Sequence, residues 1–515
     1  MKVIVIGSGM SGLTAGAYLA QAGQAVTIYE QFSEPGGVTA TLKRGGFGWD
    51  LGPLILEGFG PGDRGRRVLE ELGVSEQVKA VREDRGLVLP DFSLWKPDRY
   101  QGLYWRRERL SQIYPDERDN LLRYYRFYDQ MMDLMSLARQ AEEASGVSAL
   151  WLKGRMALAF QRVKGMADWN AKQLMDHYFH HDAIKLVFTA IVADFATKPS
   201  EFPALGVPSI HLETAFDKRI PALPGRDSAR TGYFYILDGC QSLVNAVISA
   251  LTARKAAVVT GTAVQKIVLE EGRVKGVELS GGQFEPADLV IASGGAKETF
   301  YGLVGKEHLP KEICEMLERN TYMESVMMVH LGIDFDPTPY QPAALCYYYG
   351  TYDLEGSIDQ LRLGHYHEGK EGFLIYVPSL HSPSLAPPGC HAVTIYTLAP
   401  NNLIEGNWQD KREELADKLV AEAERIIPGL KAHTLRREIL TPQDFRDRTG
   451  QQHHSFGGTP PIIGNQSPAH RTPIQGLWFV GAQSESGGGV RNVMLGARKA
   501  ARQILATLSS EESRP

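Results

Sequence analysis

Cysteine is scarce in this chain, with four residues in 515, at positions 240, 314, 346 and 390. These residues lie far apart and form no C-x-x-C pair, which argues against a disulfide framework and against a structural zinc site. We therefore expect a reducing, cytoplasmic environment and no bound metal.

Long apolar runs and an excess of positive charge are absent as well. No run reaches the roughly 18 consecutive apolar residues of a membrane span, and the N-terminal stretch has no cleavage site, so we expect neither a span nor a secretion signal. The formal net charge of −5 gives no sign of the excess of basic residues that nucleic-acid-binding proteins carry, so we do not expect nucleic acid as a partner. A chain of this length has room for two domains and a large substrate, so small molecules are the expected partners.

Glycine, in contrast, is plentiful, with 53 residues. The apolar run from Val3 to Ile6 predicts a buried parallel strand, and the sequence GSGMSG that follows it matches the pattern G-x-G-x-x-G. The first glycine permits a tight turn, the second lets the backbone approach a pyrophosphate, and the third lets a helix pack against the strand. We expect this loop to bind a dinucleotide at the N-terminus of the helix through Gly7, Ser8, Gly9, Met10, Ser11 and Gly12.

An acidic residue follows at the expected distance. The helix is predicted to end at Gly23, and the next strand, Val26 to Ile28, leads to Glu30, 18 residues after Gly12. A carboxylate there accepts both ribose hydroxyls of an adenosine and repels a 2′-phosphate. With this glycine content, chance gives about 0.5 matches to the pattern per chain, and the second match, GPGDRG at 60–65, lacks a clear strand and helix, so we expect a loop there.

Two further glycine-rich stretches predict a longer ligand. Gly36 and Gly37 provide a second place where the backbone can meet a ligand. Near the other end, residues 476–505 predict a strand, a turn at Gly481, a glycine run and a helix, whose first N–H groups suit the pyrimidine edge of a flavin. We therefore expect the two ends of the chain to share one site.

The two end stretches resemble the FAD-binding ends of the phytoene desaturase-like flavoproteins, which include carotenoid desaturases, carotenoid cis–trans isomerases and retinol saturase and are related to the amine oxidases. Residues 261–279 and 287–305 resemble the inner segments of that FAD domain, and residues 166–188 resemble the helical substrate region. The resemblance implies an α/β fold in which a Rossmann-type FAD-binding domain is interleaved with an α+β substrate domain. It also implies a further set of FAD contacts, among which Val264 lays its backbone against adenine: Gly36, Gly37, Val38, Val264, Gly481, Ala482, Gly488, Gly489 and Val490.

The domain division that follows is discontinuous. The FAD-binding domain is expected to comprise residues 1–72, 225–300 and 440–510, and the substrate domain residues 73–224 and 301–439. Within the latter, a helix predicted over 115–145 carries an apolar stripe that either packs in the core or lines a substrate tunnel: Leu121, Tyr124, Tyr128, Met131, Met135 and Ala138.

The resemblance implies an FAD-dependent oxidoreductase that moves hydride between a carbon of a hydrophobic polyene or isoprenoid substrate and the flavin. Desaturation is the first hypothesis, with a quinone or O₂ as the electron acceptor. The alternatives are redox-neutral cis–trans isomerisation, saturation by reduced flavin, amine oxidation, and a non-catalytic FAD-bound binding protein. The chain departs from the family pattern beside the expected flavin ring, with Val38 in place of a cation and Ser484 to Ser486 in place of T-H-P.

Glu485 is the candidate catalytic residue. If its loop lies as in the family, burial beside the flavin would raise the pKa of its carboxyl group and suit it to proton transfer. The alternative is that it points outward and has no chemical role. His453 and His454, which precede this region, are expected to be structural or surface histidines.

A last stretch, 151–165, is rich in both apolar and basic residues and suggests contact with a membrane surface. On a helical wheel Lys153 and Lys164 share one side and Arg155 and Arg162 the opposite side, so we expect no clean amphipathic face. Peripheral membrane contact nevertheless remains an expectation, because a polyene would have to be collected from lipid.

Overall fold

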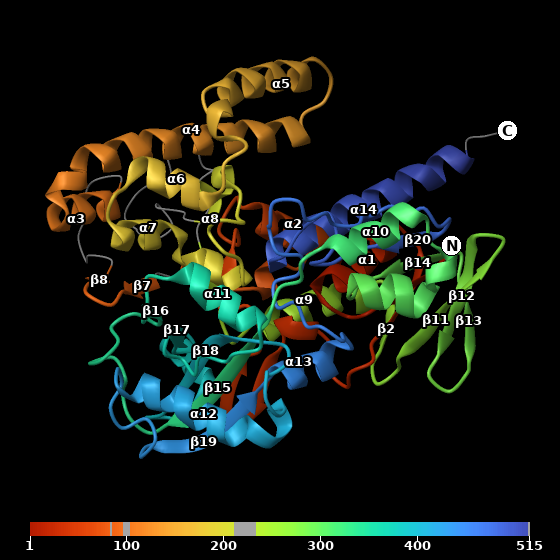
Figure 1. The fold of residues 1–515 in the computed structure, drawn as a ribbon. Helices are drawn as coiled ribbons and strands as arrows, with labels where there is room; N and C mark the ends of the chain where they lie inside the picture. Colours follow the sequence, from red (N-terminus) through yellow and green to blue (C-terminus); the bar gives the residue numbers. More distant parts are fainter. Residues whose placement is uncertain (83–84, 96–103, 211–232, 513–515) are drawn as a thin grey trace.

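The computed structural model describes residues 1–82, 85–95, 104–210 and 233–512 (Figure 1). Its first layer is a parallel sheet that joins distant parts of the chain, since β1 pairs with β14 and β14 pairs with β20. Val3, Ile4 and Val5 of β1 are fully buried, as expected for the middle strand of such a sheet. The strand order is β10 (Ala257–Val259), β2 (Ala25–Tyr29), β1 (Lys2–Ile6), β14 (Leu289–Ala292) and β20 (Leu477–Phe479).

Helices cover one face of this sheet, and a small antiparallel sheet covers the other. The helices share one apolar core with the sheet (Figure 1); they are α1 (Met10–Gln21), α2 (Arg64–Leu72), α9 (Gln241–Thr252) and α14 (Val490–Glu512). A second core lies on the opposite face; it includes β11 (Val264–Glu270), β12 (Arg273–Leu279) and α10 (Lys311–Arg319), with β13 (Phe284–Pro286) pairing with β12.

The second large sheet has seven strands and is mostly antiparallel. Its strand β15 is buried along its whole length, and the next two strands of the chain, β16 and β17, pair antiparallel with each other. The helix α12 (Trp408–Glu424) shares a core with this sheet, and α13 (Pro442–Thr449) follows its edge strand. The strand order is β19 (Thr434–Leu440), β15 (Ser325–Ile333), β18 (His391–Ala399), β17 (Gly372–Tyr376), β16 (Leu345–Tyr349), β7 (Arg85–Val88) and β8 (Ser93–Leu94).

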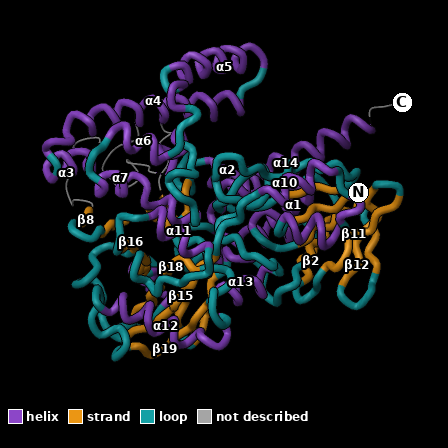
Figure 2. The backbone as a smooth tube through the Cα atoms, viewed as in Figure 1, coloured by secondary structure: helices purple, strands orange, loops and turns teal. Residues whose placement is uncertain are grey.

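A group of helices stands at one end of the seven-stranded sheet, as the tube view in Figure 2 shows. It contains α3 (Trp105–Ile113), α4 (Arg118–Glu143), α5 (Gly146–Gln161), α6 (Ala171–Tyr178), α7 (Asp182–Thr189) and α8 (Val207–Ile210), with α11 (Leu354–Arg362) between this group and the sheet. Four residues of the predicted α4 stripe are buried in an aromatic core: Leu121, Tyr124, Tyr128 and Met131. No helix in the described ranges combines the length and the apolar content needed to cross a membrane.

Two small sheets complete the fold: β3 (Thr41–Arg44) with β4 (Phe47–Asp50), and β5 (Leu56–Glu57) with β9 (Tyr233–Ile236) and β6 (Ala80–Arg82). The loop expectation for GPGDRG needs correction, because this stretch lies between β5 and α2 and its last glycine is already helical. The expected fold class is confirmed as a Rossmann-type parallel sheet combined with a second, mainly antiparallel sheet. The residue boundaries of the two domains stay a prediction.

Candidate functional site

The glycine loop between β1 and α1 has three glycines with different surroundings. A Cβ atom at Gly7 would lie 2.6 Å from the carbonyl oxygen of Ser293, and one at Gly12 would lie 2.2 Å from the carbonyl oxygen of Gly7. A Cβ atom at Gly9 would come no closer than 3.9 Å to another atom, the Ser293 hydroxyl. The protein therefore requires glycine at Gly7 and Gly12 for its own packing, whereas the space beside Gly9 is open for a ligand.

Glu30 is buried next to this loop at the end of β2. One carboxylate oxygen accepts hydrogen bonds from the Ser8 N–H at 2.8 Å and the Ser8 hydroxyl at 2.6 Å, and the other accepts from the Phe32 N–H at 2.9 Å. The backbone of Glu30 pairs with Val259 and Thr262, just before the strand that Val264 opens. Glu30 thus fixes the start of the glycine loop, and the predicted adenine-facing segment runs beside it.

The paired glycines lie against the same loop. The Gly36 N–H donates to the Ser8 carbonyl at 3.0 Å, and a Cβ atom at Gly37 would lie 3.4 Å from the Gly9 Cα. Gly36 has φ +116°, a conformation that favours glycine. Val38 is half-buried and packs against an apolar cluster of the second sheet, and as a valine it contributes no charge after the glycine pair.

Arg448 of α13 supplies a cation at this place. Its Nε donates to the Gly37 carbonyl at 2.8 Å, and its guanidinium carbon lies 4.4 Å from the centre of the Phe32 ring. Burial lowers the pKa of Arg448, while the carboxylates of Glu34 and Glu30 act to raise it. Its Nη2 atom is buried and has no hydrogen-bond partner among the described residues.

This unpartnered donor and the open space beside Gly9 fit a dinucleotide with a pyrophosphate, because a buried N–H of a cation needs an acceptor and phosphate oxygens provide one. No sequence motif indicates Arg448. It lies 411 residues from Gly37, and nothing in the local pattern of α13 indicates which way its guanidinium points.

The C-terminal glycine loop meets the N-terminal one. A Cβ atom at Gly481 would lie 3.5 Å from the Ser11 hydroxyl, which itself is 2.7 Å from the Ser293 hydroxyl. Further along, a Cβ atom at Gly488 would lie 1.8 Å from the Gly457 carbonyl oxygen. The structure therefore brings the two ends of the chain together at the start of α1.

The remaining residues predicted for the C-terminal part of the site lie on this loop or at the start of α14. The Ala482 carbonyl accepts a hydrogen bond from Thr459, and the Gly489 carbonyl accepts the first helical bond of α14 from Val493. Val490 is buried at the first residue of that helix. The N-terminus of α14 thus lies beside the same loop, as expected for a helix that presents N–H groups to a ligand.

Glu485 pairs with Lys499 of α14 and with His470. Its carboxylate lies 3.2 Å from the Lys499 ammonium and 3.7 Å from Nε2 of His470, and its side chain is 36% exposed. An exposed ion pair on the α14 side of the loop is not the buried environment expected for a proton donor, so the contacts favour the alternative in which the residue has no chemical role.

A small, mostly apolar cavity of about 50 Å³ lies between α11 and the seven-stranded sheet. Its walls include Tyr347, Tyr349 and Tyr396, and its polar side includes Asp194, whose carboxylate accepts a hydrogen bond of 2.9 Å from the Tyr347 hydroxyl. Burial raises the pKa of Asp194 to about 6, against the lowering effects of that hydrogen bond and of Arg85.

An aromatic contact connects this cavity with the C-terminal glycine loop. The ring of Tyr396 lies 5.6 Å from that of Phe456, and the next residue, Gly457, packs against Gly488. The cavity is therefore one side chain away from the region where the flavin is expected.

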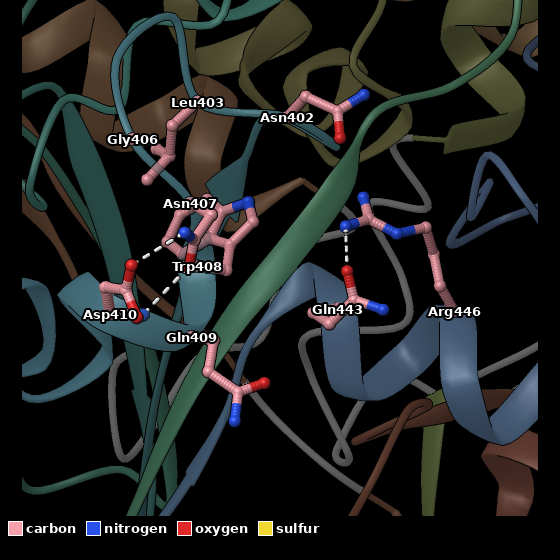
Figure 3. Close-up of a pocket in the computed structure, with 9 residues that line it drawn as sticks. All are labelled: Asn402, Leu403, Gly406, Asn407, Trp408, Gln409, Asp410, Gln443 and Arg446. Carbon is pink, nitrogen blue, oxygen red and sulfur yellow. Dashed lines mark hydrogen bonds between the residues drawn. The ribbon is translucent and has the colours of Figure 1, made fainter.

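A larger pocket of about 400 Å³ lies elsewhere, between the start of α12 and α13 (Figure 3). Its polar groups bond to one another: Asn407 caps α12 through the Asp410 N–H at 2.9 Å, and Arg446 donates to the Gln443 side chain at 2.5 Å. This pocket contains no part of the glycine loops, so we assign no ligand to it. Within the described ranges no group of three or more His, Cys, Asp or Glu side chains is placed to hold a metal ion.

Comparison with known proteins agrees with this geometry. A prolycopene isomerase of Daucus carota is 25% identical over 538 residues, covering 99% of this chain and 81% of the relative. A lycopene-forming phytoene desaturase of Pseudescherichia vulneris is 23% identical, covering 98% of this chain and 99% of the relative. Both matches thus extend over almost the whole chain.

Solved structures share the fold. An oxidoreductase from Methanosarcina mazei superposes with a TM-score of 0.62 at 20% identity over 98% of this chain and all of that chain. A putrescine oxidase bound to putrescine gives 0.60 at 15% identity over 98% of this chain and 99% of that chain. The model of the flavin-containing amine oxidoreductases matches residues 10–505, so this chain is a flavin-dependent oxidoreductase and belongs to that family.

Proposed function

We propose that the protein binds FAD and desaturates a hydrophobic polyene or isoprenoid substrate. The observation that carries the proposal is the FAD-sized cradle of glycine loops with the buried, unpartnered donor of Arg448, from which Tyr396 and Phe456 lead to a small aromatic-walled cavity. Rings of this kind stack along a conjugated chain, and apolar walls favour a substrate without charge. The names of two full-length relatives, a phytoene desaturase and a prolycopene isomerase, support the same class of substrate.

The residues that would hold FAD follow from the contacts above. The loop at Gly9 would receive the pyrophosphate together with Arg448, Glu30 would face the adenosine ribose, and the start of α14 would face the flavin ring. Bound FAD would supply a two-electron acceptor, which passes its electrons on to a quinone or O₂.

The chain itself contributes binding, orientation and a site for a proton. Desaturation removes two hydrogens from neighbouring carbons, one as hydride and one as a proton, so a base near the cavity is useful. The Asp194 carboxylate is such a group, because its pKa of about 6 leaves it mostly ionised at pH 7 and able to take a proton. The tyrosine walls orient the chain of the substrate and exclude water.

Redox-neutral isomerisation is the second candidate, because prolycopene isomerases are among the full-length relatives. It would use the same cavity and cofactor without a net transfer of electrons. Mass spectrometry distinguishes the two reactions, since a desaturated product has lost two hydrogens per new double bond and an isomer keeps its mass.

The experiment incubates the purified holoprotein with phytoene or prolycopene in detergent micelles, with and without a quinone, and separates the products by chromatography. Loss of hydrogens that depends on the quinone supports desaturation, and a change of retention at constant mass supports isomerisation. If neither polyene changes while amines reduce the bound flavin, the proposal is wrong and amine oxidation takes its place. If no substrate and no quinone exchanges electrons with the flavin, the protein is a binding protein.

A further inference from the structure

Helix α5 exposes an unusual amount of apolar surface. Four of the twelve large apolar side chains that are exposed in the described part of the chain belong to this one helix. They are Val147 (85% exposed), Leu150 (73%), Trp151 (60%) and Leu158 (72%). Figure 1 shows α5 at the outer edge of the helical group, beyond α4. Apolar side chains gathered in this way indicate a surface that binds a partner.

These four residues lie on one face. Their spacing of three, four and eleven positions from Val147 places them in one stripe along an α-helix. The opposite face holds α5 against the protein, because Leu152 and, just beyond the helix, Val163 are buried. The packing of α5 on the protein therefore uses its other face, and the exposed stripe is free to contact a partner.

Positive charge borders the stripe. Lys153 lies along one edge and Arg155 along the other, and Arg162 and Lys164 follow at the end of the helix, all four exposed. The Arg155 guanidinium lies 4.8 Å from the centre of the Trp151 ring. Residues 146–167 contain no Asp or Glu, so nothing within this segment neutralises the four cations.

The expectation that this segment lacks a clean amphipathic face holds for the helix as a whole, because its buried side and its outward side both carry apolar residues. The basic pairs do lie on opposite sides, but the outward side between them is apolar. An apolar stripe with cations at both edges matches an interface helix, whose side chains enter the lipid while the basic groups reach the phosphates. A tryptophan at this boundary is typical of such helices.

We propose that α5 docks the protein onto an anionic lipid bilayer, with the stripe defined by Val147, Leu150, Trp151 and Leu158 inserted between the acyl chains. Opposite charge selects anionic lipid as the partner, because the four cations lie in a segment, residues 146–167, that contains no Asp or Glu, and they attract a negative surface. The proposal concerns the location of the protein and does not depend on which substrate it converts.

The first experiment measures flotation of the full-length holoprotein with vesicles. One set contains phosphatidylcholine with about one third phosphatidylglycerol, and the other contains phosphatidylcholine alone. We expect binding to the anionic set and at least about tenfold weaker binding to the neutral set, because each basic residue near the surface contributes about fivefold. Raising KCl from about 0.05 M to about 0.5 M should release the protein from the anionic vesicles.

The second experiment uses two double variants. Leu150→Ser with Leu158→Ser removes apolar surface, and Lys153→Glu with Arg155→Glu reverses charge; each should weaken binding to anionic vesicles at least about tenfold. The matched control is Leu363→Ser with Leu435→Ser, which removes leucines of similar exposure, 62% and 60%, elsewhere on the surface. This control should bind as the wild type does. Because the changed α5 residues are exposed, flavin content and thermal midpoint should not change.

A third measurement localises the contact. Brominated lipid in the anionic vesicles should quench part of the tryptophan emission, and Trp151→Phe should remove that quenching while binding persists.

Four outcomes overturn the proposal: no binding of the wild type to anionic vesicles, undiminished binding of either α5 variant, equal loss in the Leu363 and Leu435 control, or quenching that survives Trp151→Phe. A fifth is a wild-type dimer that the Leu150 and Leu158 variant converts to a monomer without affecting vesicle binding, since the stripe would then bind a second copy of the chain.

Discussion

Arg448 supplies the positive charge that the chain lacks at Val38, the position after its paired glycines. The chain has Val38 after its paired glycines, and Val38 packs into an apolar cluster, so no charge comes from that position. Arg448 reaches the neighbouring Gly37 carbonyl from α13 and keeps a buried Nη2 without a partner in the described part of the chain. A phosphate of the dinucleotide would complete its hydrogen bonds.

We therefore predict that Arg448→Gln weakens FAD binding by about 10- to 100-fold, the effect of losing a charge-assisted hydrogen bond of about 1.5 to 3 kcal/mol. Equilibrium dialysis of the apoprotein against FAD measures the dissociation constant. Arg446→Gln is the matched control on the same helix, because that side chain bonds to Gln443 and to the Asn401 carbonyl instead. Equal dissociation constants for Arg448→Gln and the wild type would show that the guanidinium faces no phosphate.

Glu485 is the residue for which sequence and structure point in different directions. If Glu485 donated a proton beside the flavin, its replacement by Gln would slow turnover about 100-fold. The carboxylate instead lies beside Lys499 and His470 and is partly exposed, and such ion pairs contribute little. We predict that Glu485→Gln keeps turnover within about threefold of the wild type, as expected for a surface ion pair. Steady-state rates at full flavin occupancy across the pH range decide between the two, and a large loss with unchanged flavin content would restore the catalytic hypothesis.

At the scale of elements, the glycine loop separates the needs of the fold from those of the ligand. Gly9 has φ −62° and ψ 165°, values that any residue adopts, and a Cβ atom there would meet only the Ser293 hydroxyl, at an unstrained 3.9 Å. A Cβ atom at Gly12 would collide with the Gly7 carbonyl. The two glycines of one motif should therefore respond differently to the same substitution.

We predict that Gly9→Ala lowers FAD affinity at least about tenfold and leaves the stability of the apoprotein within about 0.5 kcal/mol of the wild type. Gly12→Ala should destabilise the apoprotein itself by about 1 to 3 kcal/mol, because backbone atoms must move. Urea unfolding of both apoproteins and FAD titration of each provide the comparison. A Gly9→Ala protein that binds FAD normally would show that the pyrophosphate does not approach this glycine.

The elements also show what a sequence can predict here. The strands and helices around the glycine loops were predictable because the signals are local: a β-branched run, a glycine turn and a capping glycine lie within about thirty residues. The order of the seven-stranded sheet was not, since β7 pairs in parallel with β16, a partner about 260 residues away, and no local pattern encodes that pairing.

Contacts between distant parts of the chain were also what the sequence could not predict for the site and for α5. Sequence patterns identified the glycines and Glu30, which the structure brings together, but not Arg448, which depends on how α13 packs. For α5 the positions of the cations were correct, and the missing information was which face points to α4.

At the scale of the whole molecule, buried histidines couple the fold to pH. His454 lies between β15 and α13. Its Nδ1 is 2.8 Å from the Ser325 hydroxyl on β15, and its ring stacks on the Phe445 ring of α13 with the ring centres 5.0 Å apart. Burial, together with electrostatic repulsion from nearby His453 and Arg446, lowers the pKa of His454 to about 3. The imidazole is therefore neutral in the folded protein at every pH at which the protein is handled.

This shift has a definite sign. Below about pH 6.5, the ordinary value for histidine, the unfolded chain takes up a proton at His454 and the folded chain does not, so the stabilisation present above pH 6.5 is lost as the pH falls toward 3. Between pH 7.5 and 5 one such residue lowers the free energy of unfolding by about 2 kcal/mol. Burial also lowers the pKa of His330 to about 3, so His330 adds to this loss of stability. A variant that changes only His454 keeps His330.

We predict that the loss of stability between pH 7.5 and pH 5 is about 2 kcal/mol smaller in His454→Gln than in the wild type, although the variant is less stable at pH 7.5 because it loses the packing on Phe445. Urea unfolding at the two pH values measures the difference. His365→Gln is the control, since His365 is exposed and its replacement should leave the pH dependence unchanged. An identical loss of stability in His454→Gln and the wild type would mean that the buried imidazole takes up its proton without unfolding, and that the acid sensitivity of the protein arises elsewhere in the chain.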